Sequence, residues 1–291
     1  RVLVEKHTRS YLQLIKPGIT ISNTMTATAG YILAASIFGF VWQNLWGVVF
    51  GVAFVIASEC VTNNMLDRDL DTRMKRTKGR EIAAGKISLT AAALYAAVLG
   101  LVGFGVLMNF TNQIALILGV IAFVWYVVIY GVAKRTTPLS TIIGGVCGAL
   151  PPLAGYVAGS GQIDAVAWTL FGLLMVWQLP HFYAISLFRQ SDYKKAGLPV
   201  WSVRYGTRST KAQILFWVFI FVLLAPVPTL LGATGYFYLV SVLGVSVYWL
   251  YQGAQTYPRL DDVAWAKKMF GISLVVLLVL SAGFILGGYL P

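Results

Sequence analysis

Long hydrophobic runs dominate the chain, and they are apolar on every face rather than along one stripe. Residues 47–58 and 274–288 are two examples among many. With its neighbours, each run is long enough to cross the roughly 30 Å hydrocarbon core of a bilayer. Lipid offers no hydrogen bonds to the backbone, and the runs lack the alternation of barrel strands. The pattern therefore predicts an all-α polytopic membrane protein.

The runs and the polar segments between them predict nine transmembrane helices. The expected spans are residues 18–37, 44–66, 88–109, 113–133, 138–158, 164–187, 211–231, 234–254 and 270–289. The tripeptide Ala-Gly-Tyr recurs at residues 29–31 and 154–156, in the first and fifth spans. This repeat suggests a duplicated unit in which the second and sixth spans are counterparts.

The positions of lysine and arginine support this number of spans. All 22 lie in residues 1–16, 68–86, 134–135, 189–211 and 259–268, and the alternate connections carry none. Because basic loops are retained in the cytoplasm, we expect a cytoplasmic N-terminus and an external C-terminus. The net charge of +12 then reflects contact with anionic lipid rather than with nucleic acid.

The composition indicates few chemically reactive side chains outside the polar loops. Of the residues, 58% are hydrophobic and only 11% are charged, so charge is concentrated in few places. Both cysteines, Cys60 and Cys147, fall inside apolar runs, which argues against a disulfide framework or a metal-binding cysteine pair. We interpret both as small packing residues.

Residues 63–80, NNMLDRDLDTRMKRTKGR, hold an unusual density of both charges. Asn63, Asp67 and Asp71 are spaced at i, i+4 and i+8, so a continuing helix places them in one stripe. Carboxylate and amide oxygens suit Mg²⁺, which commonly completes its coordination with substrate phosphate. The basic residues that follow are available for the remaining phosphate charge: Lys75, Arg76 and Arg80.

Two other interpretations fit the same residues. The aspartates could pair with Arg73 and Lys75 on a solvated helix end. The stripe could also coordinate a permeating cation in a membrane transporter. However, Glu59 and Asn63 extend the polar stripe into the apolar span, where ionisable groups are costly and usually functional.

Two motifs resemble those of the UbiA superfamily of intramembrane prenyltransferases. Asn63-x3-Asp67-x3-Asp71, followed by Lys-Arg-Thr at residues 75–77, resembles its aspartate-rich motif. Tyr130-x3-Lys134 is similar to its Tyr-x3-Lys motif. The resemblance covers the whole chain and implies one domain, residues 1–291, of nine helices around a central cavity. It also implies that the polar cytoplasmic loops 67–88 and 188–211 cap a Mg²⁺-dependent active site.

Within the superfamily, quinone-type members carry a second Asp-x3-Asp motif after the sixth span. This chain has only Asp192 there, with Arg189 near the place of the first aspartate. The segment 177–182, WQLPHF, and the start KPG at 16–18 resemble the branch that farnesylates heme B. That resemblance implies transfer of a farnesyl group from farnesyl diphosphate to a heme vinyl group, with addition of water, to give heme O. A quinone or another aromatic acceptor is the alternative.

The resemblance and the reaction's needs assign roles to side chains. The expected metal ligands are Asn63, Asp67 and Asp71, and the expected catalytic residues are Asp67, Asp71, Tyr130 and Lys134. Further substrate-binding residues are Lys75, Arg76, Arg80, Arg135, Trp177, His181, Arg189, Asp192 and Lys195, with Asn63. Trp125, Tyr126, Tyr130 and Trp177 are candidates for shielding an allylic cation.

His181 has two interpretations: a ligand of heme iron, or a hydrogen bond to a helix that Pro180 has disturbed. The expected location is a bacterial plasma membrane, with the lipid bilayer as surroundings. A heme A synthase or a terminal oxidase assembly is the partner protein that heme O production implies.

Overall fold

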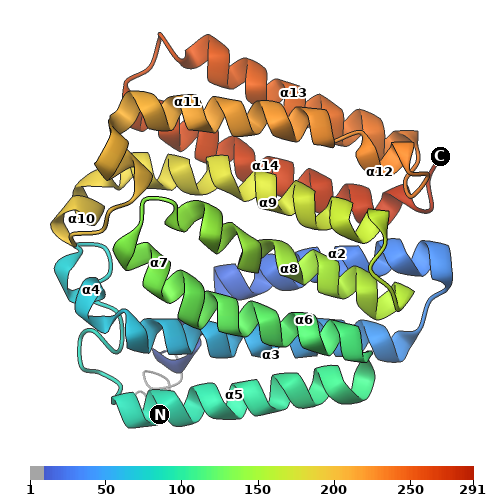
Figure 1. The fold of residues 1–291 in the computed structure, drawn as a ribbon, viewed down its shortest axis with the longest axis horizontal. Coiled ribbons are helices and arrows are strands. Elements are labelled where there is room, and N and C mark those ends of the chain that lie inside the picture. The colour runs from blue at the N-terminus through green and yellow to red at the C-terminus, as the bar shows by residue number, and fades with distance from the viewer. Residues whose placement is uncertain (1–9) are drawn as a thin grey trace, which may run out of the picture.

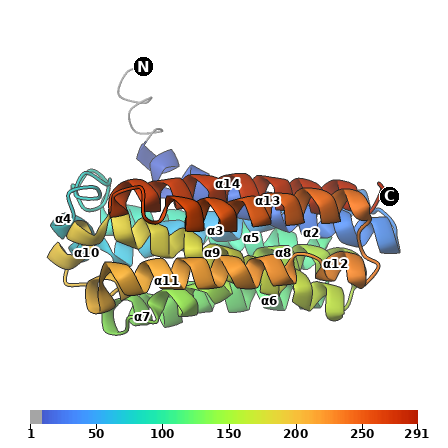
Figure 2. The same ribbon diagram turned by 90° about the horizontal axis from the view of Figure 1, so that it is seen from above.

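The computed structural model describes residues 10–291, so Arg1, Lys6 and Arg9 of the basic N-terminal arm lie outside the described residues. Long helices run side by side along one direction, as Figures 1 and 2 show. The elements are α2 (Pro17–Phe38), α3 (Trp42–Leu66), α4 (Arg68–Arg73), α5 (Leu89–Phe110), α6 (Gln113–Val124), the π-helix η1 (Trp125–Tyr130), α7 (Gly131–Thr136), α8 (Ser140–Ser160), α9 (Ala165–Phe188), α10 (Gln190–Lys195), α11 (Trp201–Leu224), α12 (Val227–Leu230), α13 (Tyr236–Thr256) and α14 (Asp262–Gly287).

Several helices begin where polar side chains cap their free N–H groups. Ser88, Asn112 and Asp164 each accept a hydrogen bond from the third residue after them. Asp261 caps α14 through two N–H groups, so this helix begins at Asp262 rather than at the expected residue 270. Likewise α11 begins at Trp201 instead of residue 211, because the chain continues helically across a kink at Gly206.

Eight helical stretches in the described part of the chain are long and apolar enough to cross a membrane, so the protein is an integral membrane protein. The expected number of nine was one higher, and α2 makes the difference. Its serines, threonines and asparagine lower its hydropathy. Several of these groups bond to the helix's own carbonyls, as Asn23 does to Ile19 and Thr28 to Thr24, which satisfies them locally.

The two Ala-Gly-Tyr tripeptides meet in the structure, because α2 packs directly on α8. Gly30 lies against the carbonyl oxygen of Pro152, and Gly155 lies against that of Ala27. Each tyrosine then reaches the N-cap of the next long helix. Tyr31 donates to the carbonyl of Val41 before α3, and Tyr156 donates to Asp164 before α9. A short helix follows each of these two long helices, α4 after α3 and α10 after α9.

The short helices α4 and α10 lie at one end of the bundle, together with α7 and the α13–α14 connection (Figure 1). The two polar loops contact each other there. Leu70 and Met74 of the first loop form a small apolar cluster with Ala196, Leu198 and Val200 of the second. Most of the basic residues are therefore gathered at this end, which we call the basic end.

Substitution of Gly155 by Ala should destabilise the bundle. A Cβ atom at residue 155 would lie 1.8 Å from the backbone oxygen of Ala27, so α2 and α8 would have to separate. We expect a loss of about 3 kcal/mol in the free energy of unfolding, measured as thermal unfolding in detergent. Gly172→Ala is the matched control, because nothing lies within 4 Å of its Cβ position. Equal unfolding midpoints for the two variants would contradict this packing.

Candidate active site

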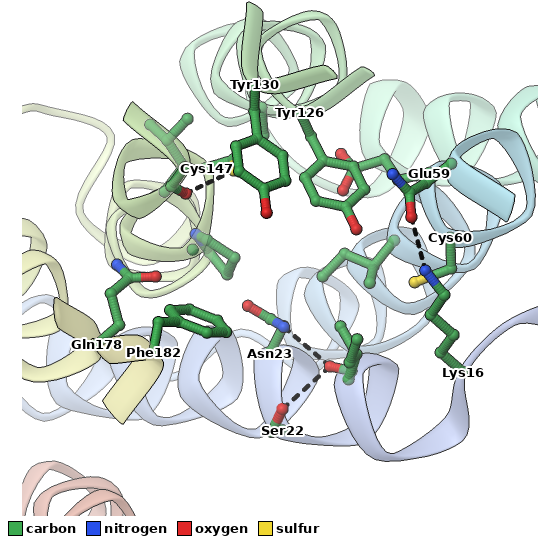
Figure 3. Close-up of a pocket in the computed structure, with 18 of the residues that line it drawn as sticks. Lys16, Ser22, Asn23, Glu59, Cys60, Tyr126, Tyr130, Cys147, Gln178 and Phe182 are labelled. Carbon is green, nitrogen blue, oxygen red and sulfur yellow. Dashed lines mark hydrogen bonds between the residues drawn. The ribbon is translucent and has the colours of Figure 1, made fainter. Parts of the chain in front are cut away.

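A cavity of about 660 Å³ opens inside the bundle at the basic end. Residues of α2, α3, α6, η1, α8, α9 and α14 form most of its wall, and the short helices α4, α7 and α10 contribute residues near the basic end. Figure 3 shows Tyr126 and Tyr130 reaching down from η1, with Glu59, Cys60 and Lys16 on one side and Gln178 and Phe182 on the other. Charged residues line one end, and Val48, Val52 and Leu118 are among the apolar residues deeper in the membrane.

The predicted oxygen-rich stripe forms along one face at the charged end of the cavity. Although α3 ends at Leu66, the Asp67 N–H donates to Asn63 and the Asp71 N–H donates to Asp67, at 2.9 and 2.8 Å. The helical turn thus continues into α4. Asn63, Asp67 and Asp71 all line the cavity, and their spacing of four residues is the reason.

Each aspartate of the stripe is paired with a cation from another segment. The Lys134 ammonium of α7 donates to Asp67 Oδ2 at 2.5 Å, and both side chains are nearly buried. Arg80 binds both carboxylate oxygens of Asp71, at 2.8 and 2.9 Å. Arg80 reaches back because the chain turns after Met74, where the Thr77 hydroxyl bonds to the Asp71 carbonyl.

Asn63 is held by Lys16, whose ammonium donates to Asn63 Oδ1 at 2.7 Å. Lys16 is the one non-glycine residue of the described chain with a positive φ, 48°. It directly precedes Pro17, which excludes the ordinary helical conformation for the residue before it. Burial lowers the pKa of Lys16 to about 8, since a cation loses its hydration there.

Asp67 has a second oxygen that fits a metal ligand. Asp67 Oδ1 is sealed from solvent and has no hydrogen-bond partner among the described residues, which is costly for a carboxylate. The Arg135 guanidinium lies 3.5 Å from this oxygen. No group of three or more His, Cys, Asp or Glu gathers within residues 10–291, so protein carboxylates alone do not complete a site. The donor set therefore fits a hard cation such as Mg²⁺ that shares its coordination with phosphate.

Arg135 lies outside the cavity and binds the segment that carries the stripe on its far side from the cavity. It makes two hydrogen bonds of 2.9 Å to Asp69 and one of 2.7 Å to the Leu66 carbonyl. The hydrogen bonds from Arg135 to the Asp69 carboxylate lower the pKa of Asp69 to about 2. Asp69 and Arg135 thus fix the junction between α3 and α7.

A π-helical turn aims two tyrosines into the cavity. η1 widens the helix at residues 125–130, and the Tyr126 and Tyr130 rings stack at 5.6 Å with an angle of 19°. Gly144 on α8 leaves room for Tyr130, because a Cβ there would lie 2.7 Å from the ring. Trp125 points elsewhere and donates its indole N–H to the Ile143 carbonyl. Such π-helical turns are frequent at functional sites.

The opposite wall is aromatic and comes from α9 and α14. The Trp177 and His181 rings stack at 5.0 Å, and Phe270 lies 4.8 Å from His181 on α14. The Nδ1 atom of His181 lies 2.7 Å from the Ser273 hydroxyl oxygen. All three rings line the cavity, so this wall is aromatic and carries one imidazole.

The structure brings most of the predicted site residues together. Those that line the cavity are Asn63, Asp67, Asp71, Arg76, Arg80, Tyr130, Lys134, Trp177 and His181. Those that do not are Lys75, Arg135, Arg189, Asp192 and Lys195. The helix α10 reaches the cavity through Tyr193 instead, a residue for which the sequence offered no signal. Lys16 was expected only as part of a motif, and its position before Pro17 is the signal that could have identified it.

Comparison with known proteins agrees with this geometry. The model of the UbiA prenyltransferase family matches residues 23–280, and the chain belongs to this family. The chain is 41% identical to protoheme IX farnesyltransferase 2 of Pseudomonas aeruginosa, over 94% of this chain and 92% of that protein. Among solved structures, a digeranylgeranylglyceryl phosphate synthase has a TM-score of 0.79 at 24% identity, covering 97% of this chain and 99% of that one. A UbiA homologue from Archaeoglobus fulgidus, bound to GPP and Mg²⁺, has a TM-score of 0.65 at 16% identity, covering 95% and 99%.

The buried pair of Asp67 and Lys134 should behave as one energetic unit. We expect Asp67→Asn and Lys134→Met each to lower the free energy of unfolding by about 3–5 kcal/mol, because each removes one member of a nearly buried ion pair. The double variant should lose much less than the sum. Thermal unfolding without ligand measures this cycle, and Asp69→Asn, in a half-exposed pair, should cost at most about 1 kcal/mol. Additive losses would contradict the coupling.

Proposed function

We propose that this chain is a protoheme IX farnesyltransferase that converts heme B and farnesyl diphosphate into heme O. In this reaction the allylic C–O bond breaks and its electron pair leaves with diphosphate. The first farnesyl carbon bonds to the terminal carbon of a heme vinyl group. Water adds to the other vinyl carbon and releases one proton. The relatives of nearly equal length, at 38–41% identity, support this activity.

The observation that carries the proposal is the joining of two environments in one cavity. Its basic end holds the oxygen-rich stripe with Lys16, Arg76, Arg80 and Lys134, and its other walls are apolar and aromatic. A prenyl diphosphate has the same division, because a highly charged group is attached to a hydrocarbon tail. The charged end lies at the membrane boundary, where both parts of such a molecule are stable.

Asn63, Asp67 and Asp71 would hold Mg²⁺ at the stripe. The Asp67 oxygen that has no hydrogen-bond partner among the described residues supports this role, and a UbiA homologue binds Mg²⁺ together with GPP. When bound, the ion would neutralise negative charge on the departing diphosphate. Carboxylates and an amide without sulfur or imidazole suit Mg²⁺ rather than zinc.

The cations of the cavity would bind the diphosphate oxygens. Arg80 and Lys134 are held in place by the aspartates, and Arg76 lines the cavity beside them. Fixed positive groups stabilise a leaving anion without reorganisation in the transition state. Arginine adds bidentate contacts to phosphate.

Tyr126 and Tyr130 would shield the farnesyl cation. Their stacked rings face the cavity just inside the charged end, and aromatic faces attract positive charge. The loops 67–88 and 188–211, which contact each other through Leu70, Met74 and Leu198, would cap the active site and restrict water.

The aromatic wall of α9 and α14 would receive heme. Trp177 and Phe270 offer apolar surface to the flat porphyrin, and His181 would contact or bind its iron. Three further expected residues lie outside the cavity, on or next to α10: Arg189, Asp192 and Lys195. They would contact substrate only at the mouth of the cavity, where Arg189 and Lys195 would bind heme propionates.

The membrane orientation belongs to the same proposal. The basic end would face the cytoplasm, following the distribution of lysine and arginine. A bacterial plasma membrane agrees with the bacterial source of the relatives. A heme A synthase or a terminal oxidase assembly would take up the product.

Removal of the metal ligands should abolish turnover. We expect Asp67→Ala and Asp71→Ala each to lower the rate about 100-fold or more, because the developing diphosphate charge loses its stabilisation. Incubation with labelled farnesyl diphosphate and heme B, followed by mass analysis, measures the product. Chelation of Mg²⁺ should have the same effect, whereas Asp69→Asn should keep near-parental turnover. Near-normal, metal-dependent turnover of both alanine variants would overturn the metal assignment, and product from an aromatic acid but not from heme B would overturn the acceptor.

Substitution of His181 should change the heme spectrum. In purified, heme-loaded protein, we expect His181→Ala to shift the Soret band because the iron loses an imidazole ligand. The only other histidine of the sequence, His7, supplies the control variant His7→Ala. An unchanged Soret band in the His181 variant would exclude iron ligation, although the apolar contact with heme would remain.

A further inference from the structure

Ser273 on α14 is a buried polar residue that the proposed chemistry does not use. Its exposed fraction is 0%. Its hydroxyl oxygen lies within hydrogen-bonding distance of one carbonyl oxygen and one ring nitrogen. The hydroxyl donates to the Phe270 carbonyl at 2.6 Å, within its own helix. The Nδ1 atom of His181 lies 2.7 Å from the same oxygen. The two contacts compete for one hydroxyl proton.

Counting protons decides which atom donates to which. If Ser273 donates to Phe270, His181 must carry its proton on Nδ1 and donate it to the Ser273 oxygen, so both contacts become hydrogen bonds. If Ser273 donates to Nδ1 instead, the Phe270 contact is lost and the imidazole proton moves to Nε2. The first arrangement makes two bonds from two protons, and the second makes one. In an apolar wall, the arrangement with more hydrogen bonds is favoured.

The other ring nitrogen faces the cavity. Nε2 of His181 makes no hydrogen bond within residues 10–291, and it is not among the polar atoms that are sealed from solvent. Because His181 lines the cavity, the Nε2 lone pair is open to a bound molecule. Trp177 and Phe270 hold the plane of the ring by stacking.

Ser273 also holds Trp177, but through its backbone. The Trp177 indole N–H donates to the Ser273 carbonyl at 2.8 Å. Replacing the serine side chain therefore leaves this bond intact and removes only the acceptor for His181. The hydroxyl and the carbonyl thus have separable effects.

We propose that Ser273 is a positioning residue that fixes His181 as the Nδ1–H tautomer and directs the Nε2 lone pair into the cavity. A histidine that binds metal usually donates its other N–H to a fixed acceptor, and Ser273 supplies that acceptor. The consequence for heme iron rests on the proposed function, whereas the tautomer itself is a property of the ligand-free protein.

The tautomer can be measured directly because the chain has only two histidines. Protein labelled with ¹⁵N-histidine, compared with His7→Ala for assignment, reports by NMR which ring nitrogen of His181 carries the proton. We expect the Nδ1–H form in the parent. Ser273→Ala should lower the ratio of Nδ1–H to Nε2–H about fivefold or more, since one hydrogen bond is lost. Ser273→Thr, which keeps a hydroxyl, should restore the parental ratio.

Two further measurements separate positioning from general damage. Ser246→Ala removes a similar buried hydroxyl that bonds to its own helix, on α13, and should leave the His181 signal unchanged. In heme-loaded protein, Ser273→Ala should weaken heme binding about 10-fold and move the Soret band, with Ser273→Thr closer to the parent. An Nε2–H form in the parent, or an unchanged ratio in Ser273→Ala, would overturn the proposal. If the ratio changes as expected but His181→Ala leaves the Soret band unchanged, the tautomer assignment holds and iron ligation fails.

Discussion

The need to neutralise acidic groups at a membrane boundary organises this structure. Asp67 and Asp71 are too buried for water to solvate them fully, so each must have a cation. The cations come from segments far away in the sequence, Lys134 from α7 and Arg80 from the loop after α4. Lys16, just before α2, donates to the neutral amide of Asn63. The two ion pairs and this hydrogen bond hold α2, α3, α7 and the first polar loop together around the mouth of one cavity.

The same pairing prepares the cavity for a charged ligand. In the proposed function a metal ion would replace the lysine at a carboxylate, while phosphate would replace the carboxylate at the lysine. Total charge near the stripe then stays balanced. Asp67 is the place where the protein's own pairing is incomplete, since one oxygen is bonded to Lys134 and the other has no hydrogen-bond partner among the described residues. The protein thus keeps its positive groups fixed in advance, which is the main requirement for stabilising a leaving anion.

The spacing of residues along one helix was sufficient to predict part of the site. Residues that a turn of the chain brings into or out of the site could not be predicted from spacing. The stripe of Asn63, Asp67 and Asp71 follows from helical periodicity alone, so the sequence predicted it correctly. Lys75 was expected beside Arg80, but the turn after Met74 sends Arg80 back to Asp71 and leaves Lys75 exposed. α2 was expected as a ninth span, but its serines, threonines and asparagine keep its hydropathy below that of the eight candidate spans. Several of these side chains bond within the helix, which an average over composition does not take into account.

The two Ala-Gly-Tyr tripeptides belong to two sets of helices that present different side chains to the cavity. α2, α3 and α4 correspond in order and contacts to α8, α9 and α10, including the tyrosine that bonds to the next N-cap residue. The first set presents acids to the cavity, whereas the second presents Trp177 and His181. In the second set Asp192 lies outside the cavity, and Tyr193 takes the inward position. Because only the first set concentrates negative charge, it is the set that would bind metal and diphosphate in the proposed function. The other set remains apolar and aromatic, as the proposed flat acceptor would require.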